Sequence, residues 1–117
     1  FMKHYLAIYL GTPEAMARWN TLPAAEQQSR TQQGVAAWHA WADRNAASIV
    51  EGGGPLGKTK HVSPEGIRDV RNAMAAWVVV QAESHDAAAK LFEGHPHFSI
   101  FPGESVEIME CLPVPGA

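Results

Sequence analysis

The sequence predicts an α+β domain in which a four-stranded antiparallel sheet carries both of its helices on one face. Two stretches with strand character, residues 3–10 and 74–81, have apolar side chains on both faces, which is typical of central strands. Helical patterns separate the strand patterns, and the order along the chain is strand, helix, strand, strand, helix, strand.

Composition limits the kind of protein this is. The 117 residues suffice for one domain, residues 2–115. The net charge is −3 and the basic residues are scattered, which argues against nucleic-acid binding. No apolar run is long enough to span a membrane, so we expect no membrane partner. The single cysteine, Cys111, and the lack of a signal-like start favour the cytoplasm, with Cys111 as a small buried apolar residue.

The first half of the chain begins with a strand and continues with helices. Residues 3–10 alternate, with Tyr5 and Tyr9 on one face. Thr12 and Pro13 are placed to cap and start a short helical turn, and the Thr-Leu-Pro of 21–23 repeats this signal before a long helix over 24–47. We expect Trp38 and Trp41 to pack in the core of the domain rather than to stack on a ligand.

The middle of the chain contains a short strand, 48–51, and a glycine run, 52–54. A phosphate-binding loop would need a helix directly after the glycines, and Pro55 and Gly57 block one. The run therefore predicts a bulge or bend where the chain passes close to another backbone. Lys58, Lys60 and His61 form a small basic cluster, typical of a solvated hairpin edge. Residues 63–66 predict a turn, and the segment 67–72 is ambiguous.

The last third repeats the strand–helix–strand order. After the strand at 74–81, Ser84 can cap a helix over 85–93 that ends at Gly94. Residues 95–103 contain two prolines, which predicts a stiff, extended loop that carries His95 and His97 on the same side. A final strand covers 105–112.

The sheet face without helices would expose apolar groups such as Met109 and one side of Trp77. An uncovered apolar face favours association. We therefore expect a homodimer in which two sheets pack face to face.

The chain resembles the YCII-related proteins over essentially the whole domain. The matching motifs are KHYLAIY at 3–9, IVEGGGPL at 49–56, VVVQAES at 78–84 followed by AAAK at 87–90, and VEI at 106–108. The resemblance implies a ferredoxin-like fold, a dimeric α/β barrel and a cleft between sheet and helices. Some members carry a His–Asp pair on the long helix, but here Gln33 stands at the histidine position and Asp43 is offset.

Three kinds of function stay open. In the first, the protein transforms a small molecule, with His95 or His97 as general acid or base and with Asp43 or His39 orienting or sharing the proton. The pocket of that site would involve Trp41, Trp38, Phe98 and Lys58. In the second, the same cleft binds a ligand, or the dimer serves assembly, without catalysis. In the third, His95 and His97 bind a metal together with His61 or Glu104. The sequence predicts no cofactor and favours no bound metal.

Overall fold

A computed structural model describes residues 2–116 of the chain. The strands and helices occur in the order β1 (Lys3–Gly11), α1 (Pro13–Asn20), α2 (Ala24–Arg44), β2 (Ile49–Pro55), β3 (Thr59–Ser63), β4 (Gly66–Val70), β5 (Met74–Ala82), α3 (His85–Lys90), α4 (Pro96–Ser99) and β6 (Gly103–Glu110). A short 3₁₀ turn, Ala46–Ser48, joins α2 to β2.

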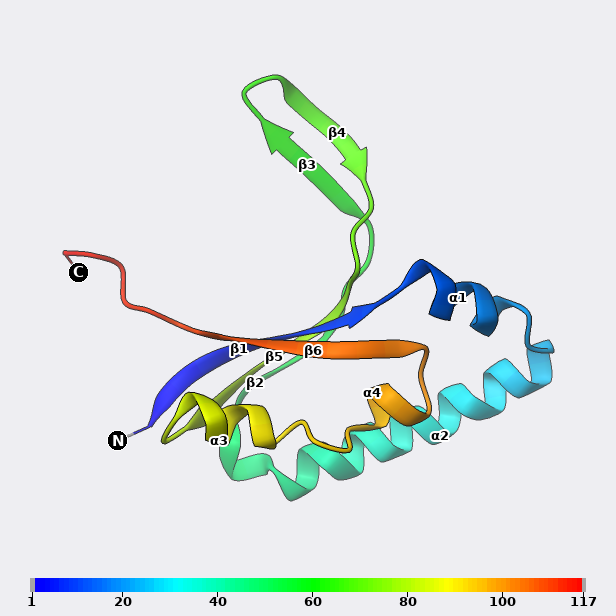
Figure 1. Ribbon diagram of the computed structural model, residues 1–117, viewed down its shortest axis with the longest axis horizontal. Helices are drawn as coiled ribbons and strands as arrows, with labels where there is room; N and C mark the ends of the chain where they lie inside the picture. Colours follow the sequence, from blue (N-terminus) through cyan, green and yellow to red (C-terminus); the bar gives the residue numbers. More distant parts are fainter. Residues whose placement is uncertain (1, 117) are drawn as a thin grey trace.

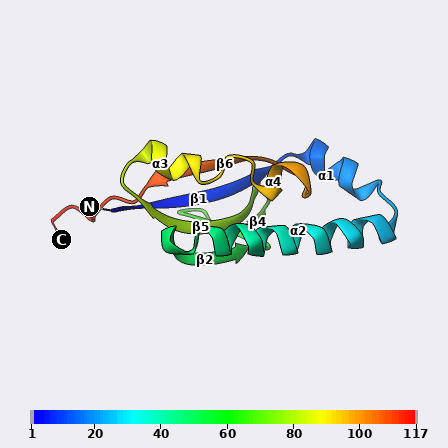
Figure 2. The same ribbon diagram turned by 90° about the horizontal axis from the view of Figure 1, so that it is seen from below.

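The main sheet has four antiparallel strands in the order β2-β5-β1-β6, so β1 and β5 are central as predicted. Figure 1 shows α2, α3 and α4 on one side of this sheet. Seen from below in Figure 2, α2 runs on the side of β2 and β5, and α3 lies on the side of β6. The predicted sheet with its helices on one face is therefore confirmed.

The core lies between the sheet and the helices because one face of each central strand is buried. In β1, Tyr5, Ala7 and Tyr9 are buried and alternate with half-buried residues. In β5, Val78 and Val80 do the same. The alternation predicted for residues 3–10 thus separates a helix-covered face from an open face.

The glycine run of β2 forms the predicted bulge. The pairing of β2 with β5 is irregular between Glu51 and Gly54. Gly53 has a φ of 60°, and a Cβ on it would collide with the carbonyl oxygen of Trp77. Only glycine fits a position with both properties.

The helix caps follow the sequence closely, with small differences at the ends. Thr12 and Ser84 accept hydrogen bonds from the backbone of the first turns of α1 and α3. The long helix ends at Arg44 rather than at residue 47, and Pro23 rather than Thr21 precedes its first turn. Gly94 has a φ of 68° and ends the turn after α3.

Two sequence-based expectations are wrong, and one ambiguous segment is resolved. The segment after His95 is a short helix, α4, because Pro96 stands at its first position and the His95 ring caps it. Residues 59–70 form a separate hairpin, β3–β4, with the predicted turn between its strands, and the ambiguous segment 67–72 supplies most of its second strand. Cys111 is exposed because β6 ends one residue before it.

Gly34 has a packing role inside α2. It is buried, and the ring of Phe101 occupies the space where a Cβ would stand. The helix thus accepts a residue of low helical propensity so that Phe101 can lie against its backbone. Among residues 2–116, no helix is long and apolar enough to cross a membrane.

We predict that the effect of Gly34→Ala reverses sign when Phe101 is truncated. In the wild-type background the new methyl group displaces the Phe101 ring, and overpacking lowers the free energy of unfolding by about 1–3 kcal/mol. In a Phe101→Ala background the methyl group has space. The better helical propensity of alanine then raises the free energy of unfolding by about 1 kcal/mol. Urea denaturation of the four proteins measures both effects. Equal stabilisation in both backgrounds would contradict the packing role.

Candidate functional site

His95 lies completely buried beneath the sheet, inside a ring of aromatic side chains. Its ring centroid is 5.0 Å from that of Tyr9 and 4.6 Å from those of Trp38 and Trp41. Phe92 closes the ring at 6.1 Å. Side chains from β1, α2 and the turn after α3 therefore fill the space around His95.

Both nitrogens of His95 are engaged in hydrogen bonds. Nδ1 accepts a bond of 3.0 Å from the backbone N–H of His97, so it carries no hydrogen. Nε2 therefore carries the hydrogen of the neutral ring and donates it to the Tyr9 hydroxyl at 3.1 Å. Burial, and to a lesser extent the nearby His97, lowers the pKa of His95 from 6.5 to about 4. His95 is neutral at pH 7 in this one tautomer.

His97 is held through the opposite nitrogen. Its Nε2 lies 2.8 Å from the carbonyl oxygen of Leu10 and 3.1 Å from that of Ser105, so Nε2–H donates to both. Burial lowers the pKa of His97, while the two carbonyls act in the opposite direction. Within residues 2–116, Nδ1 of His97 has no hydrogen-bond partner. The neutral ring therefore has an unused lone pair on Nδ1.

Gly103 connects His97 with a surface cavity. The imidazole of His97, including Nδ1, occupies the space where a Cβ on Gly103 would stand. The same glycine lines a cavity of about 480 Å³ between α1, the start of α2 and α4. Any other residue at position 103 would displace the ring from this place.

The cavity combines aromatic walls with positive charge. Its walls include Trp19 from α1 and the rings of Phe98 and Phe101, and it also contains Arg18 and Arg30. Arg30 forms an exposed ion pair of 3.2 Å with Glu26, and Arg18 has none within the described residues. The complete lining is Ala15, Arg18, Trp19, Thr21, Leu22, Arg30, Phe98, Ser99, Ile100, Phe101, Pro102 and Gly103, with no acidic residue.

The structure brings some of the predicted site residues together. His95 and His97 both contact Tyr9, although they do so from a helical turn and not from an extended loop. Trp41 is buried in the core with its indole N–H bonded to the Leu91 carbonyl at 2.8 Å, and Trp38 packs beside it. The core interpretation of both tryptophans is confirmed. Phe98 lines the cavity.

Other predicted residues lie elsewhere. His39 and Asp43 are exposed on α2, and neither side chain forms a hydrogen bond within residues 2–116, because the face of α2 that meets the core carries Trp38, Trp41 and Ala42. Lys58 is exposed between β2 and β3, and it does not line the cavity beside His97.

The three-ligand metal site considered from the sequence is not assembled in the described residues. No group of three His, Cys, Asp or Glu side chains there is close enough to hold a metal ion. His61 lies on β3, and Glu104 is an exposed residue of β6.

Of the residues that line the cavity, sequence reasoning identified only Phe98. Arg18 and Trp19 lie near the end of a short helix whose pattern indicates nothing beyond helix formation, and the sequence predicts a loop around Phe101. The alternation of residues 3–10 groups Tyr9 with Tyr5 on one face, but only the pairing of Tyr9 with His95 in three dimensions shows its role. The nearest available signal was the grouping of two phenylalanines and a histidine with two prolines at 96–102.

Comparisons with known proteins identify the fold. No protein-family model matches the chain, and no curated protein matches it. The structure of 5-chloro-2-hydroxyhydroquinone dehydrochlorinase (TftG) from Burkholderia phenoliruptrix, in complex with 2,5-dihydroxybenzoquinone, aligns with a TM-score of 0.52 at 18% identity, over 90% of this chain and 89% of the other. This likeness shows the fold alone and confirms the predicted α+β, ferredoxin-like class.

Two further solved structures align more weakly. Rv0793 from Mycobacterium tuberculosis has a TM-score of 0.38 at 12% identity, over 100% of this chain and 99% of the other. A putative antibiotic biosynthesis monooxygenase from Bacteriodes thetaiotaomicron has a TM-score of 0.31 at 15% identity, over 99% and 93%.

The buried, neutral His95 predicts a specific pH dependence of stability. Its pKa is about 4 in the folded protein and near 6.5 when unfolded, so the unfolded chain binds the extra proton between these values. The stability that the neutral, buried His95 gives the folded protein is fully present above pH 6.5 and is lost as the pH falls towards 4. The free energy of unfolding decreases by about 3 kcal/mol in total.

The matched variant for this prediction is His95→Asn, whose short side chain can still cap α4 but has no group that titrates in this range. We expect the difference in unfolding free energy between wild type and variant to shrink by about 2–3 kcal/mol from pH 7 to pH 4.5. Urea denaturation across this range measures it. A difference that is independent of pH would show that His95 does not titrate as described.

Proposed function

We propose that this chain binds a small planar anion in the cavity lined by Arg18, Trp19 and Phe101, and that His97 exchanges a proton with it. The observation that carries the proposal is the position of a histidine with an unused nitrogen at Gly103, which also lines a cavity containing two arginines and no acid. The order of the sequence motifs supports placing the chain among the YCII-related proteins.

The chemistry of the lining supports an anionic ring as ligand. Arginine guanidinium groups donate paired hydrogen bonds to carboxylate or enolate oxygens and stack on flat rings. Trp19, Phe98 and Phe101 offer apolar faces to a planar body. The structural neighbour TftG was solved with 2,5-dihydroxybenzoquinone, a planar ring with acidic enol hydroxyls. That compound is a suitable first probe for this chain.

The proton exchange follows from how His97 is held. The Leu10 and Ser105 carbonyls fix Nε2–H, so Nδ1 is the nitrogen that can accept a proton from a ligand. When Nδ1 accepts it, the ring becomes cationic, and the two carbonyls stabilise that form. His95 acts as a positioning residue, because its Nδ1 bonds the backbone N–H of His97.

A second function is binding without chemistry. His97 is only 4% exposed, so a ligand in the cavity would reach Nδ1 only if the backbone near Gly103 moves aside. This observation favours a protein that holds its ligand against Arg18 and Arg30 and leaves His97 as part of the scaffold.

We also propose that two copies pair through the open face of the main sheet. Leu6, Ile8, Trp77 and Val79 form a half-buried apolar centre on that face, and Met109 beside them is 39% exposed. An apolar face of this kind is typical of an interface between copies.

We predict that Arg18→Gln and Arg30→Gln each weaken binding of 2,5-dihydroxybenzoquinone about tenfold, which is the loss of one charge-assisted hydrogen bond. Isothermal titration calorimetry measures this. Lys58→Gln, which removes an exposed charge outside the cavity, should leave binding unchanged. Equal effects of all three substitutions would show that the probe senses only net charge.

His97→Gln separates the two functions. Glutamine can still donate to the Leu10 and Ser105 carbonyls but has no basic nitrogen. If His97 transfers a proton, the variant binds the probe within about threefold of wild type but loses the proton uptake or release that accompanies binding. That proton count is read from calorimetry in buffers of different ionisation enthalpy. An unchanged proton count in the variant supports binding without chemistry.

For the dimer, we predict that Leu6→Lys at the centre of the open face raises the dissociation constant at least about hundredfold, because a charge would be buried between the sheets. Met16→Lys on α1, at an apolar residue that is 49% exposed, serves as the matched control. Sedimentation equilibrium measures both. A wild-type protein that is monomeric at all concentrations would contradict the pairing.

A further inference from the structure

The β3–β4 hairpin, called the arm below, rises from one end of the main sheet on the side away from the helices (Figure 1). Among the described residues, each strand of the arm has extensive contacts only with the other strand. A hairpin of two strands is marginally stable at best in water, whereas three strands with an apolar face can be stable on their own. The arm therefore lacks a third strand.

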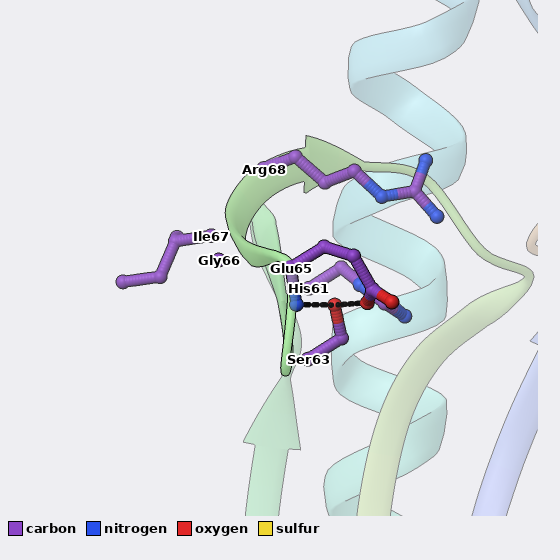
Figure 3. A pocket seen from close by; sticks show the side chains of 6 residues that line it. All are labelled: His61, Ser63, Glu65, Gly66, Ile67 and Arg68. Carbon is purple, nitrogen blue, oxygen red and sulfur yellow. Dashed lines mark hydrogen bonds between the residues drawn. The ribbon is translucent and has the colours of Figure 1, made fainter.

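One face of the arm is polar. On this face His61, Ser63, Glu65 and Arg68 line a hollow of about 390 Å³. Figure 3 shows the Ser63 hydroxyl bonded to the Glu65 carboxylate there, while the side chain of Ile67 points to the opposite side. The polar groups thus interact within the arm, and a contact with another strand has to involve the opposite face.

The opposite face is apolar and carries no net charge. Val62 and Ile67 stand opposite each other on it and are 71% and 72% exposed. The same face carries Lys60 and Asp69, which form an ion pair with each other. This face is therefore suited to an uncharged, apolar partner.

The segment that follows β6, residues 111–116 and called the tail below, has matching properties. It contains no charged residue, and Leu112 and Val114 are 73% and 72% exposed. The backbone N–H of Cys111 donates to the His4 carbonyl, so the backbone groups of Cys111 face β1. Because successive residues of a strand direct these groups to opposite edges, those of Leu112 and Val114 face away from β1.

Prolines leave the tail with only one edge that can pair fully. Pro113 and Pro115 alternate with Leu112 and Val114, and they have no backbone N–H. They stand on the edge that faces β1, which explains why pairing with β1 ends before them. A strand whose prolines face outward is tolerated at the edge of a sheet. The tail can therefore add to another sheet as its outermost strand, bonded through Leu112 and Val114.

The tail of the same copy does not reach the arm. Figure 1 shows the tail leaving the main sheet at the end opposite to the arm, towards the same side of the sheet. The nine residues of β1 separate these two ends by about 30 Å. The six residues of the tail extend over at most about 20 Å. A tail that pairs with the arm must therefore come from a second copy.

The size of the open face also favours a further contact between copies. Its four strands, about 4.8 Å apart and about 26 Å long, give an area of about 500 Å². Each partner of a stable interface buries about 800 Å². A two-fold axis that crosses the strands at right angles places the tail end of each copy over the arm end of the other, where the missing area can be supplied.

We propose that the tail of each copy adds to the arm of a second copy as a third strand, so that a two-fold dimer contains two arm–tail contacts. In antiparallel pairing, Leu112 and Val114 lie on the same face as Val62 and Ile67, because residues directly opposite each other have side chains on one face. This inference rests on the open-face pairing proposed above, but it adds a contact that can fail while that pairing holds.

Disulfide cross-linking tests the arm–tail contact. In a Cys111→Ser background, one chain carries Ile67→Cys and the other carries Val114→Cys, both at exposed positions, so that folding is retained. We expect mild oxidation of the equimolar mixture to form the mixed disulfide dimer at least about tenfold faster than either chain cross-links with itself. In the matched control, Met16→Cys on α1, an exposed apolar position, replaces Val114→Cys and should show no such preference.

A double-mutant cycle provides a second measurement. Leu112→Ser with Val114→Ser should raise the dimer dissociation constant about tenfold, and should have no further effect once Val62→Ser and Ile67→Ser are present. Sedimentation equilibrium measures the four proteins. A wild-type dimer with additive effects and no preference for the mixed cross-link would overturn the arm–tail contact alone. Faster cross-linking of the Ile67→Cys chain with itself would also overturn it, because the arms would then meet each other. A monomeric wild type would overturn this contact together with the open-face pairing.

Discussion

The site depends on one constraint, which is that His95 is buried completely and must be neutral with both ring nitrogens satisfied. Each hydrogen bond that meets this requirement has a structural consequence. The bond from the His97 backbone to Nδ1 closes the first turn of α4, and the bond from Nε2 to Tyr9 attaches that turn to the central strand β1. A charged His95 would oppose both the burial and the cap.

Because α4 is attached in this way, the second histidine has a different role. His97 contacts the carbonyls of β1 and β6 through Nε2, which joins these strands next to the point where β6 begins. Its ring fills the space beside Gly103, and Gly103 lines the arginine-containing cavity. The two histidines, only two residues apart, thus have different roles. His95 holds the turn through both ring nitrogens, whereas His97 keeps one nitrogen available for chemistry. The proposed proton exchange with an anionic ligand rests on this separation.

The sequence indicated the fold well because its signals there are local or periodic. Alternation identified β1, proline and hydroxyl residues identified the starts of α1 and α3, and the glycine run identified the bulge at Gly53. The site was less accessible because it depends on long-range contacts. Two prolines suggested an extended loop, whereas the capping by the His95 ring makes that segment helical. Arg18 and Phe101 come from distant segments, and only the fold brings them to one cavity.

The most direct test is the tautomer of His97, determined by ¹⁵N chemical shifts of the imidazole nitrogens at pH 7. The structure predicts a neutral ring with hydrogen on Nε2 and a bare Nδ1, whose ¹⁵N signal moves when 2,5-dihydroxybenzoquinone binds. The His97→Gln variant assigns the signals. A ring with hydrogen on Nδ1, or a cationic ring at pH 7 without ligand, would contradict the assignment of His97 as the group that accepts a proton.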